Sequence, residues 1–395
     1  TDGATGPGPG HPRVSAPLPR AARLLDELGL ARATPASLLA RWAAAADDPD
    51  SLGGRVWAVL GAGPRGPVGL DLAADGPHLL VEGPAGSGRT ELLRSVVASL
   101  AAAERPDRLG IVLVDGRSDG PGGAAERAEG LRVCTDLPHV TTHLAVNDPV
   151  RMREFAQSLS TELKRRAELT GRTHFAEWHT QRAVSGHMVA QRPAPGGPPA
   201  AGAGDLEAPP SSTLRLRPGA GREKKPGAAS PLPRLVVVVD DLDGLLAPPL
   251  GSPGRPAAGS VVRALEAVAR DGERLGVHLV AAYASGGGPQ WTASPVVVLD
   301  VPGGGAEDPA PGRGLLRGAD GRVTEVQSGR VTGRIPRTAT QRPTVVALDW
   351  ARMGDPPDRR PVRELGNGPT DLALLASALE RAARSVSAHE VPSLL

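Results

Sequence analysis

The stretch from Val81 to Glu91 constrains the fold of this chain more than any other. An apolar run (residues 77–81) comes before it and an apolar-periodic run (residues 92–100) follows, which predicts a strand, a glycine-rich loop and a helix. The pattern G-x-x-x-x-G-K-[ST], the P-loop, is matched at its glycine and threonine positions. Backbone N–H groups of such a loop, with the dipole of the following helix, bind phosphate oxygens. The predicted nucleotide-binding residues are Gly83, Pro84, Ala85, Gly86, Ser87, Gly88, Arg89, Thr90 and Glu91.

One position of the motif departs from the pattern, because Arg89 stands where lysine is expected. A guanidinium is broad and planar, so it does not cleanly replace a compact ammonium group. The chain contains three lysines among 45 basic residues, so drift from lysine to arginine can reach even a motif. The loop is therefore either a working site that tolerates arginine or a nucleotide site that has lost part of its chemistry.

Composition separates ordered from irregular segments. Aromatic residues make up 2% of the 395 residues, while there are 51 glycines and 41 prolines. This bias is typical of linkers and disorder, which we expect in residues 1–18 and in an insertion at 184–231. The net charge of +2 indicates no nucleic-acid partner by itself. The single cysteine, Cys134, excludes an internal disulfide framework and is interpreted as a small buried apolar residue.

The termini and the hydropathy pattern bear on where the chain works. No apolar stretch approaches the roughly 18 residues of a transmembrane helix, and the N-terminus lacks the regions of a signal peptide. We therefore expect a soluble polypeptide. The chain begins with Thr1 and not with methionine, which hints at a fragment or a processed chain.

The order of the remaining segments predicts the fold class. Apolar strands at 109–115, 235–241 and 277–282 alternate with helical stretches at 150–169 and 259–270. Strands that are apolar on both faces and alternate with helices are typical of parallel α/β sheets. We expect a three-layer α/β P-loop NTPase domain of the RecA-like type.

Short segments on either side complete the expected organisation. Helices at 21–30 and after Thr34, followed by a hairpin of strands at 55–60 and 68–72, predict a small N-terminal helical and hairpin subdomain. Short strands are also expected within 131–140, 296–300 and 314–317, and Thr370 caps a final helix, 371–387. The expected division is a flexible N-terminus (1–18), a lead-in (19–76), the P-loop domain (77–350), and a linker with a C-terminal helix (351–395).

Two carboxylates at the end of the valine-rich strand predict the rest of the site. Such a strand-end aspartate, here Asp240, holds magnesium through water, and the Thr90 hydroxyl reaches the same ion. The next residue, Asp241, is the candidate that places or deprotonates the attacking water; motor ATPases commonly have glutamate there. A misplacement of about 1 Å costs on the order of 100-fold in rate. Asp115, at the end of another strand, either approaches the nucleotide or simply ends its strand.

At this point the chain resembles the FtsK/SpoIIIE-type ATPases, which include the EccC ATPases of actinobacterial type VII secretion. The similarity covers about residues 20–335 without the insertion. It is carried by the extended P-loop, the strand ends and several loop motifs, namely residues 77–93, 114–116, 136–140, 162–166, 237–245, 269–279 and 311–316.

The resemblance implies the cofactors, partners and setting. Members of this family bind ATP and Mg²⁺ between neighbours, form hexameric rings or strings of modules, and move DNA or export proteins. The implied partners are therefore ATP, with DNA or a secreted protein as substrate, in a homo-oligomer or as one module of a longer chain. The implied localisation is cytoplasmic, at the inner face of the membrane through parts outside this chain.

Four departures from the family pattern fall on one reaction. Besides Arg89 and Asp241, Glu273 stands at the position of an arginine that acts as a finger on the neighbouring site, although Arg274 lies beside it. Ala284 stands at the position of a phosphate-sensing glutamine. We therefore expect ATP binding with weak or no hydrolysis. Two alternatives stay open: an active ATP-driven DNA translocase, and a nucleotide-free scaffold or adaptor for partner ATPases.

Other polar residues receive structural interpretations. Four histidines lack metal-ligand spacing with one another and are expected at the surface or in packing roles: His139, His143, His174 and His179. The basic residues 164–166 are interpreted as a solvated helix end, with contact to a neighbouring subunit or nucleic acid as the alternative.

Overall fold

The structure is a computed structural model. It describes residues 17–116, 129–191, 232–246, 255–286, 288–289, 294–300, 308–340, 350–353 and 362–395. The expectation of a flexible N-terminus therefore falls almost entirely outside the described residues, as does the expected disordered insertion beyond residue 191.

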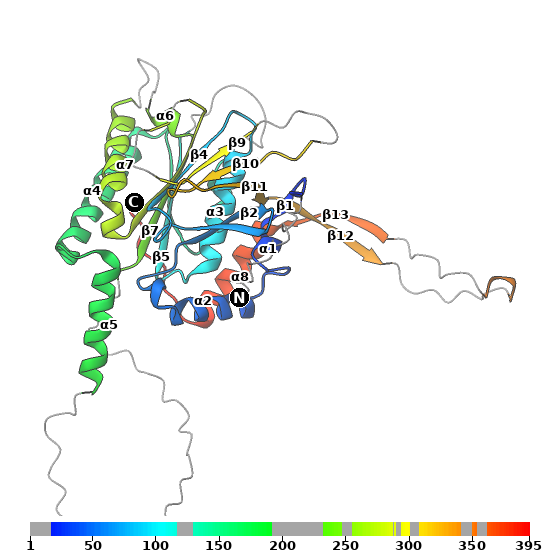
Figure 1. The fold of residues 1–395 in the computed structure, drawn as a ribbon, viewed down its shortest axis with the longest axis horizontal. Helices are drawn as coiled ribbons and strands as arrows, with labels where there is room; N and C mark the ends of the chain where they lie inside the picture. Colours follow the sequence, from blue (N-terminus) through cyan, green and yellow to red (C-terminus); the bar gives the residue numbers. More distant parts are fainter. Residues whose placement is uncertain are drawn as a thin grey trace, which may run out of the picture.

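One large mixed sheet organises the chain (Figure 1). Six neighbouring strands run parallel, in the order β9 (Val296–Leu299), β4 (His78–Glu82), β8 (Val277–Tyr283), β7 (Arg234–Asp240), β5 (Leu109–Asp115) and β6 (Val140–Ala145). An antiparallel half continues from β9 through β10 (Arg313–Arg317), β11 (Val323–Arg330), β2 (Trp57–Gly63) and β3 (Gly66–Asp71). The short β1 (Ala22–Arg23) pairs with β11.

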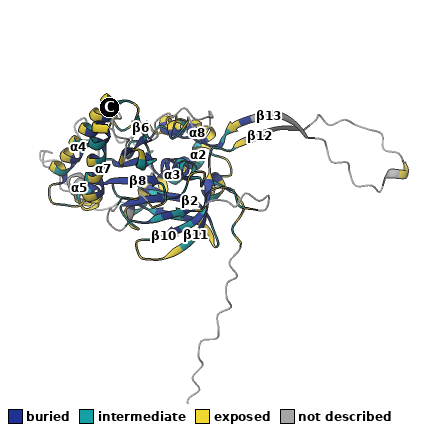
Figure 2. Ribbon diagram, turned by 90° about the horizontal axis from the view of Figure 1, so that it is seen from above, coloured by how far each residue is buried: buried dark blue, intermediate teal, exposed yellow. Residues whose placement is uncertain are grey.

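Helices cover both faces of the sheet, so the fold has the predicted three layers (Figures 1 and 2). One core contains side chains of α2 (Pro35–Asp47), α3 (Arg89–Ala103) and α8 (Asp371–Ser385). The opposite core contains side chains of α4 (Pro149–Thr170), α6 (Leu242–Leu246) and α7 (Arg255–Leu275). The strands of the parallel half are almost wholly buried because both faces are covered. The predicted α/β P-loop NTPase fold class is confirmed.

The predicted lead-in elements are present, and they pack into the same sheet. The β2–β3 hairpin forms as expected, and β2 then pairs with β11. Thr34 begins α2 with a reciprocal capping box, and the Thr370 hydroxyl caps α8. The first helix is shorter than expected: α1 (Leu24–Glu27) is a single turn, because the residues before it form β1.

Two further boundaries differ from expectation. Residues 131–140 contain a 3₁₀ turn, η2 (Arg132–Cys134), and not the expected strand, which starts only at Val140. Buried Leu131, Cys134 and Leu137 recur every third residue, so this segment packs as a turn against the core. Helix α5 (Phe175–Gln191) also continues into the start of the expected insertion.

The remaining elements lie outside the main sheet. β12 (Arg334–Thr340) and β13 (Val362–Thr370) form a separate two-stranded ribbon that leads away from the body in Figures 1 and 2. Short 3₁₀ turns occur at η1 (Pro49–Ser51) and η3 (Trp350–Arg352). Within the described ranges, none of the helices combines the length and apolar character that crossing a membrane requires.

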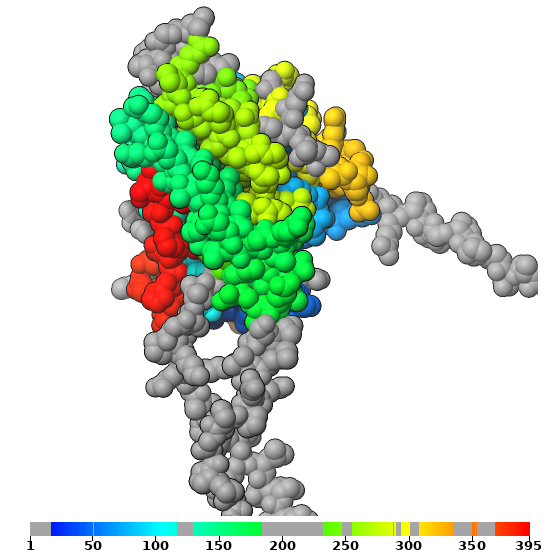
Figure 3. Space-filling view, turned by 90° about the vertical axis from the view of Figure 1, so that its left-hand side faces the viewer, coloured from blue at the N-terminus to red at the C-terminus, as the bar shows by residue number. Residues whose placement is uncertain are grey.

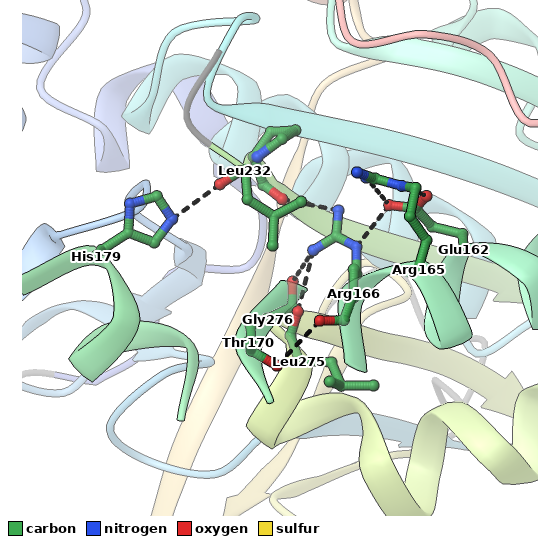
Figure 4. Close-up of polar contacts among 9 residues, drawn as sticks. Glu162, Arg165, Arg166, Thr170, His179, Leu232, Leu275 and Gly276 are labelled. Atoms are coloured by element: carbon green, nitrogen blue, oxygen red, sulfur yellow. Dashed lines mark hydrogen bonds and ion pairs between the residues drawn. The ribbon is translucent and has the colours of Figure 1, made fainter. Parts of the chain in front are cut away.

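A buried arginine fixes α4 to the ends of two other elements (Figure 4). Arg166 is 1% exposed and donates to the carbonyls of Pro233 (2.8 Å) and Leu275 (3.0 Å) and to Glu162 Oε1 (2.7 Å). Arg165 is half exposed and pairs with the same glutamate. The interpretation of this segment as a solvated helix end or a partner contact is therefore wrong for Arg166, whose planar fork satisfies buried acceptors.

The C-terminal segment covers the edge of the sheet at β6. Leu394 N donates to Thr142 Oγ1 (3.0 Å), and the Ser393 hydroxyl lies 3.0 Å from the same atom. The Leu394 side chain packs against the core that α4 and α7 share. Figure 3 shows this segment in red along the side of the teal and green α4. An edge strand covered in this way is protected from pairing with another chain.

Candidate nucleotide-binding site

The loop between β4 and α3 has the geometry that its glycines predict. A Cβ on Gly83 would lie 2.5 Å from Ser87 Oγ and 3.1 Å from Leu299 Cβ, so a side chain at this position would crowd the loop. Gly88 has φ +97°, a left-handed conformation that favours glycine, and it precedes the first residue of α3. Ser87 Oγ is buried and has no hydrogen-bond partner among the described residues. The loop therefore folds back on itself around a buried polar atom.

The N–H groups around this loop are available to an anion. Ser87 N donates to Pro84 O (3.3 Å), which closes the turn, while Ala85 and Gly86 are exposed at its tip. In the described structure the N–H groups of Gly86 and of the first residues of α3 donate to no backbone carbonyl. Such orphan donors at a helix N-terminus favour a phosphate group.

Thr90 and Asp240 meet as the two motifs predict. Thr90 Oγ1 donates to Asp240 Oδ2 at 2.7 Å, and Asp240 is 4% exposed. The strand β8 lies between β4, which leads into the loop, and β7, which ends at Asp240. A hydroxyl and a carboxylate are hard oxygen donors, the chemistry that Mg²⁺ prefers. The pair fits a magnesium ion in its ligand types.

The Arg89 guanidinium faces the strand-end carboxylates. Arg89 is 7% exposed, and its Nη2 and Nη1 lie 3.8 Å from Asp241 Oδ1 and 4.0 Å from Asp243 Oδ2. Asp241 has φ +56°, a left-handed conformation that aspartate tolerates better than most residues. The candidate catalytic carboxylate is thus an ion-pair partner of the residue at the lysine position.

Sequence reasoning missed Asp243, which joins three parts of the site. Besides its ion pair with Arg89, its Oδ2 accepts a hydrogen bond from Ala284 N at 2.6 Å. Ala284 directly follows β8, where the family pattern predicts a phosphate-sensing side chain. The available signal was the run Asp-Asp-Leu-Asp, which places three carboxylates within four residues after a buried strand.

Asp115 lies beside the site but is bound to its own surroundings. It pairs in register with Asp240 across β5 and β7, while its carboxylate accepts from Leu131 N (2.9 Å) and lies 2.7 Å from His143 Nε2. A Cβ on Gly116 would lie 2.2 Å from Asp241 O, which shows how closely β5 approaches the strand-end carboxylates. These contacts favour a structural role for Asp115, the second of the two sequence interpretations.

A comparison with models of protein families agrees with this arrangement. The sequence model of the FtsK/SpoIIIE family matches residues 58–287, which is more than half of the chain and includes the loop, Thr90 and Asp240. The chain belongs to the FtsK/SpoIIIE family. The predicted resemblance is confirmed.

Curated relatives in this family come from two kinds of system. The ESX secretion system protein EccC of Thermomonospora curvata is 27% identical over 293 residues, 69% of this chain and 18% of that protein. The ESX-5 secretion system protein EccC5 of Mycobacterium marinum is 30% identical over 31% of the chain, and the DNA translocase FtsK of Tropheryma whipplei 32% identical over 23%. The chain spans 8% and 11% of the length of these last two proteins.

Among solved structures, the chain is similar to two of EccC proteins. A Thermomonospora curvata EccC structure of ATPases 2 and 3 in complex with a signal sequence peptide is similar with a TM-score of 0.48 and 17% identity. The match covers 86% of this chain and 49% of that one. The cytoplasmic domain of the EccC ATPase from the same organism gives a TM-score of 0.47, covering 82% and 31%.

A cavity of about 1040 Å³ lies beside Gly88, on the side of α3 that carries Glu91. Glu91 and Arg94 of α3 line it together with Gln327 of β11 and Thr332. The Glu91 carboxylate, predicted as part of the nucleotide site, points to the segment after β11 and accepts from Val331 N at 2.8 Å. Glu91 therefore lies at the predicted site, but its carboxylate binds backbone N–H groups of this chain.

The structure does not bring Glu273 to this loop. Glu273 and Arg274 lie in the last turn of α7, which leads into the start of β8, while the loop lies at the opposite ends of the parallel strands. Arg274 Nη1 donates to Gly171 O at 2.9 Å, and Glu273 is exposed. Within one chain these residues are remote from the phosphate loop, so the finger position stays a prediction about a neighbouring module.

Proposed function

We propose that this chain is an ATP-binding module of an FtsK/SpoIIIE-type translocase or secretion ATPase with weak or no hydrolysis. The observation that carries the second half of this proposal is the position of Arg89. Its guanidinium is buried against Asp241 and Asp243, at 3.8 and 4.0 Å. The residue that is expected to contact the transferred phosphate is thus paired with the carboxylate that is expected to activate water.

The loop supports nucleotide binding through its backbone. Gly86 and the first residues of α3 present N–H groups that donate to no backbone carbonyl in the described structure, and such groups bind the phosphates of a P-loop ligand. The neighbouring cavity of about 1040 Å³ has room for the base and ribose. Thr90 and Asp240 would hold Mg²⁺, which when bound neutralises phosphate charge.

Weak hydrolysis follows from the chemistry of the side chains that face the phosphate. Asp241 is one methylene shorter than glutamate, and a displacement of about 1 Å costs on the order of 100-fold in rate. Arg89 also lies 3.8 Å from its carboxylate, so the guanidinium competes with an attacking water for that oxygen. Glu273 supplies no positive finger to a neighbour, and such fingers are worth about 10³–10⁵ in rate.

The assembly, cargo and location proposed for the module are taken from its relatives. EccC and FtsK proteins are far longer than this chain, and one EccC structure contains two ATPases and a signal sequence peptide. We propose that residues 77–350 form one module of a larger assembly, a homo-oligomer such as a hexamer or a chain of modules. Its cargo is a secreted protein or DNA, and its place is the cytoplasmic face of the membrane.

Two measurements test the proposal. A fluorescent ATP analogue should bind the chain in the presence of Mg²⁺, and binding should weaken in Thr90→Ala. Phosphate release should stay near background, with or without DNA. Efficient release that disappears in Asp240→Ala would overturn the inactive assignment, and stimulation by DNA would identify an active translocase. Absence of nucleotide binding, with a partner ATPase still bound, would identify a scaffold.

A further inference from the structure

Two large apolar side chains protrude together from the turn between β12 and β13. Trp350, in η3, is 82% exposed and Met353, directly after η3, is 61% exposed. Tryptophan is highly buried on average in folded chains, so this pair stands out. Figures 1 and 2 show η3 apart from the body, beyond the two-stranded ribbon. We call β12, β13 and the turn from Trp350 to Met353 the arm, and its protruding side chains are suited to contact with another molecule.

A groove of about 800 Å³ opens on the body at the base of the arm. Side chains of α8 line one side of it and residues around α1 line the other. Its lining includes Ala22, Leu25 and Leu374, of which Leu374 is 38% exposed. Arg334, the first residue of β12, also lines it. We call this cavity the α8 groove; its volume has room for an indole and a thioether, since pockets of about 300–1,000 Å³ hold whole small molecules.

The rim of the α8 groove is positively charged. In the part of the chain that the structure describes, four arginines that line the groove form no ion pair, namely Arg32, Arg330, Arg334 and Arg381. The single carboxylate among the described lining residues is Asp371, and Arg23 Nε donates to it at 2.7 Å. Guanidinium groups bind the faces of aromatic rings, and tryptophan is the best partner. The groove therefore fits an aromatic anchor with acidic neighbours.

The turn of the arm has this chemistry. Asp349 directly precedes Trp350 in the sequence. Asp355 stands two positions after Met353. An indole, a thioether and two flanking carboxylates complement an apolar groove with a guanidinium rim.

The direction of the arm decides which copy of the chain supplies the tryptophan. The arm begins at the rim of its own groove, at Arg334, and leads away from the body (Figures 1 and 2). The seven residues of β12 span roughly 20 Å, so the arm carries η3 away from that groove. A second copy offers the same groove. Because arm and groove adjoin on each copy, two copies can exchange arms reciprocally, as in a two-fold contact.

We propose that Trp350 and Met353 of one copy dock into the α8 groove of a second copy. The indole packs on the apolar lining at Leu374, and its face meets the guanidinium groups of the rim. A buried aromatic anchor of this kind supplies much of the affinity of an interface. This contact goes beyond the proposed function, which includes a homo-oligomer but names no contact surface.

Sedimentation velocity of the whole chain over a range of concentrations tests the contact. The natural chain should self-associate, and Trp350→Ala should weaken the association at least about 30-fold, as loss of an anchor does. Leu374→Glu places a carboxylate on the apolar lining and should weaken it similarly. The matched control is Leu169→Glu, at a leucine of α4 that is 48% exposed, and it should leave the association unchanged. Thermal melting shows whether each variant is folded.

Mixing the two variants separates docking of arm to groove from other contacts. Trp350→Ala keeps an intact groove and Leu374→Glu keeps an intact arm, so their mixture should associate more strongly than either variant alone. A labelled peptide of residues 345–357 should bind Trp350→Ala and not Leu374→Glu.

Three outcomes would overturn the proposal. They are a natural chain that stays monomeric up to about 100 µM, a mixture that associates no better than its components, and a peptide that binds both variants equally. Each of these measurements reads association and not nucleotide binding, so their failure leaves the proposed nucleotide-binding function standing.

Discussion

Glu91 and Thr332, 241 residues apart in the chain, are joined by two hydrogen bonds. Thr332 N donates to Glu91 Oε1 (2.9 Å) and Thr332 Oγ1 donates to Glu91 Oε2 (2.8 Å). Val331 N adds a third bond to the same carboxylate. The residue after the phosphate-loop threonine thereby fixes the segment that follows β11 to the first turn of α3.

Loss of this carboxylate should destabilise the fold. Glu91→Ala leaves two N–H donors and a hydroxyl without their charged acceptor, and bonds to charged groups are worth about 1.5–3 kcal/mol each without adding fully. We expect the free energy of unfolding in urea to fall by about 2–4 kcal/mol. Glu91→Gln, which keeps one acceptor oxygen, should lose less. Glu380→Ala at an exposed pair should lose under about 1 kcal/mol, and an equal loss in the two alanine variants would refute the assigned role.

The buried Arg166 offers a second test of stability. Arg166→Met removes the donor to three backbone carbonyls and leaves Glu162 with one partner, so we expect a loss of about 3–5 kcal/mol. The neighbouring Arg165→Met is the matched control, since Arg165 is half exposed and its ion pair is worth about 0–1 kcal/mol. Urea unfolding of the two variants measures both. Similar losses of unfolding free energy in the two variants would show that the buried contacts of Arg166 do not stabilise the fold more than the exposed pair of Arg165.

Stability should fall as the pH falls below about 6.5. Burial lowers the pKa of His139 and of His179 to about 4, and also lowers the pKa of His78 and His278 from the ordinary 6.5. Between these pH values the unfolded chain therefore binds more protons than the folded chain. The free energy of unfolding decreases from about pH 6.5 toward pH 4 as a result. Each histidine contributes up to about 1.4 kcal/mol per pH unit in this window.

Urea unfolding at pH 7.5, 6.5 and 5.5 measures this slope. His179→Gln should make the dependence of stability on pH less steep, because one group that takes up a proton on unfolding is removed. His389→Gln, at an exposed position, should leave this dependence unchanged. A stability that is constant from pH 7.5 to 5.5 would contradict burial of these neutral rings.

Cys134 should be unreactive in the folded chain. Its side chain is buried, and burial raises the pKa of the thiol to about 12. At pH 8 the thiolate fraction is then on the order of 10⁻⁴, and the thiolate is the reactive form. A chromogenic disulfide reagent should therefore react slowly with the native chain and rapidly in urea. Because this is the single cysteine of the chain, the measured rate belongs to Cys134 alone. A fast reaction of the native chain would contradict the burial of its thiol.

Much of the fold was predictable because local signals and long-range packing agree. The valine run before Asp240, the capping threonines Thr34 and Thr370, and the glycines of the phosphate loop each produce the structure that their chemistry favours. The Thr90 to Asp240 contact was predictable for the same reason, since both ends belong to motifs whose spacing encodes a common ligand.

The rest depended on partners far away in the chain. Nothing local marks Arg166 as buried, because its backbone acceptors come from residues after position 232. The ion pair of Arg89 with Asp243 depends on how α3 packs against α6, which follows β7. The position of β11 between β10 and β2 joins the lead-in to the main sheet, and sequence patterns gave no signal for it.

The first turn of α3 has a mechanical consequence. Two successive residues, Thr90 and Glu91, attach this turn to two different parts of the sheet: Thr90 to β7 in the parallel half, and Glu91 to the segment after β11 in the antiparallel half. A small rotation of this turn that relaxes one attachment strains the other. A ligand that draws Thr90 away from Asp240 therefore acts on the same helical turn that Glu91 ties to the antiparallel half.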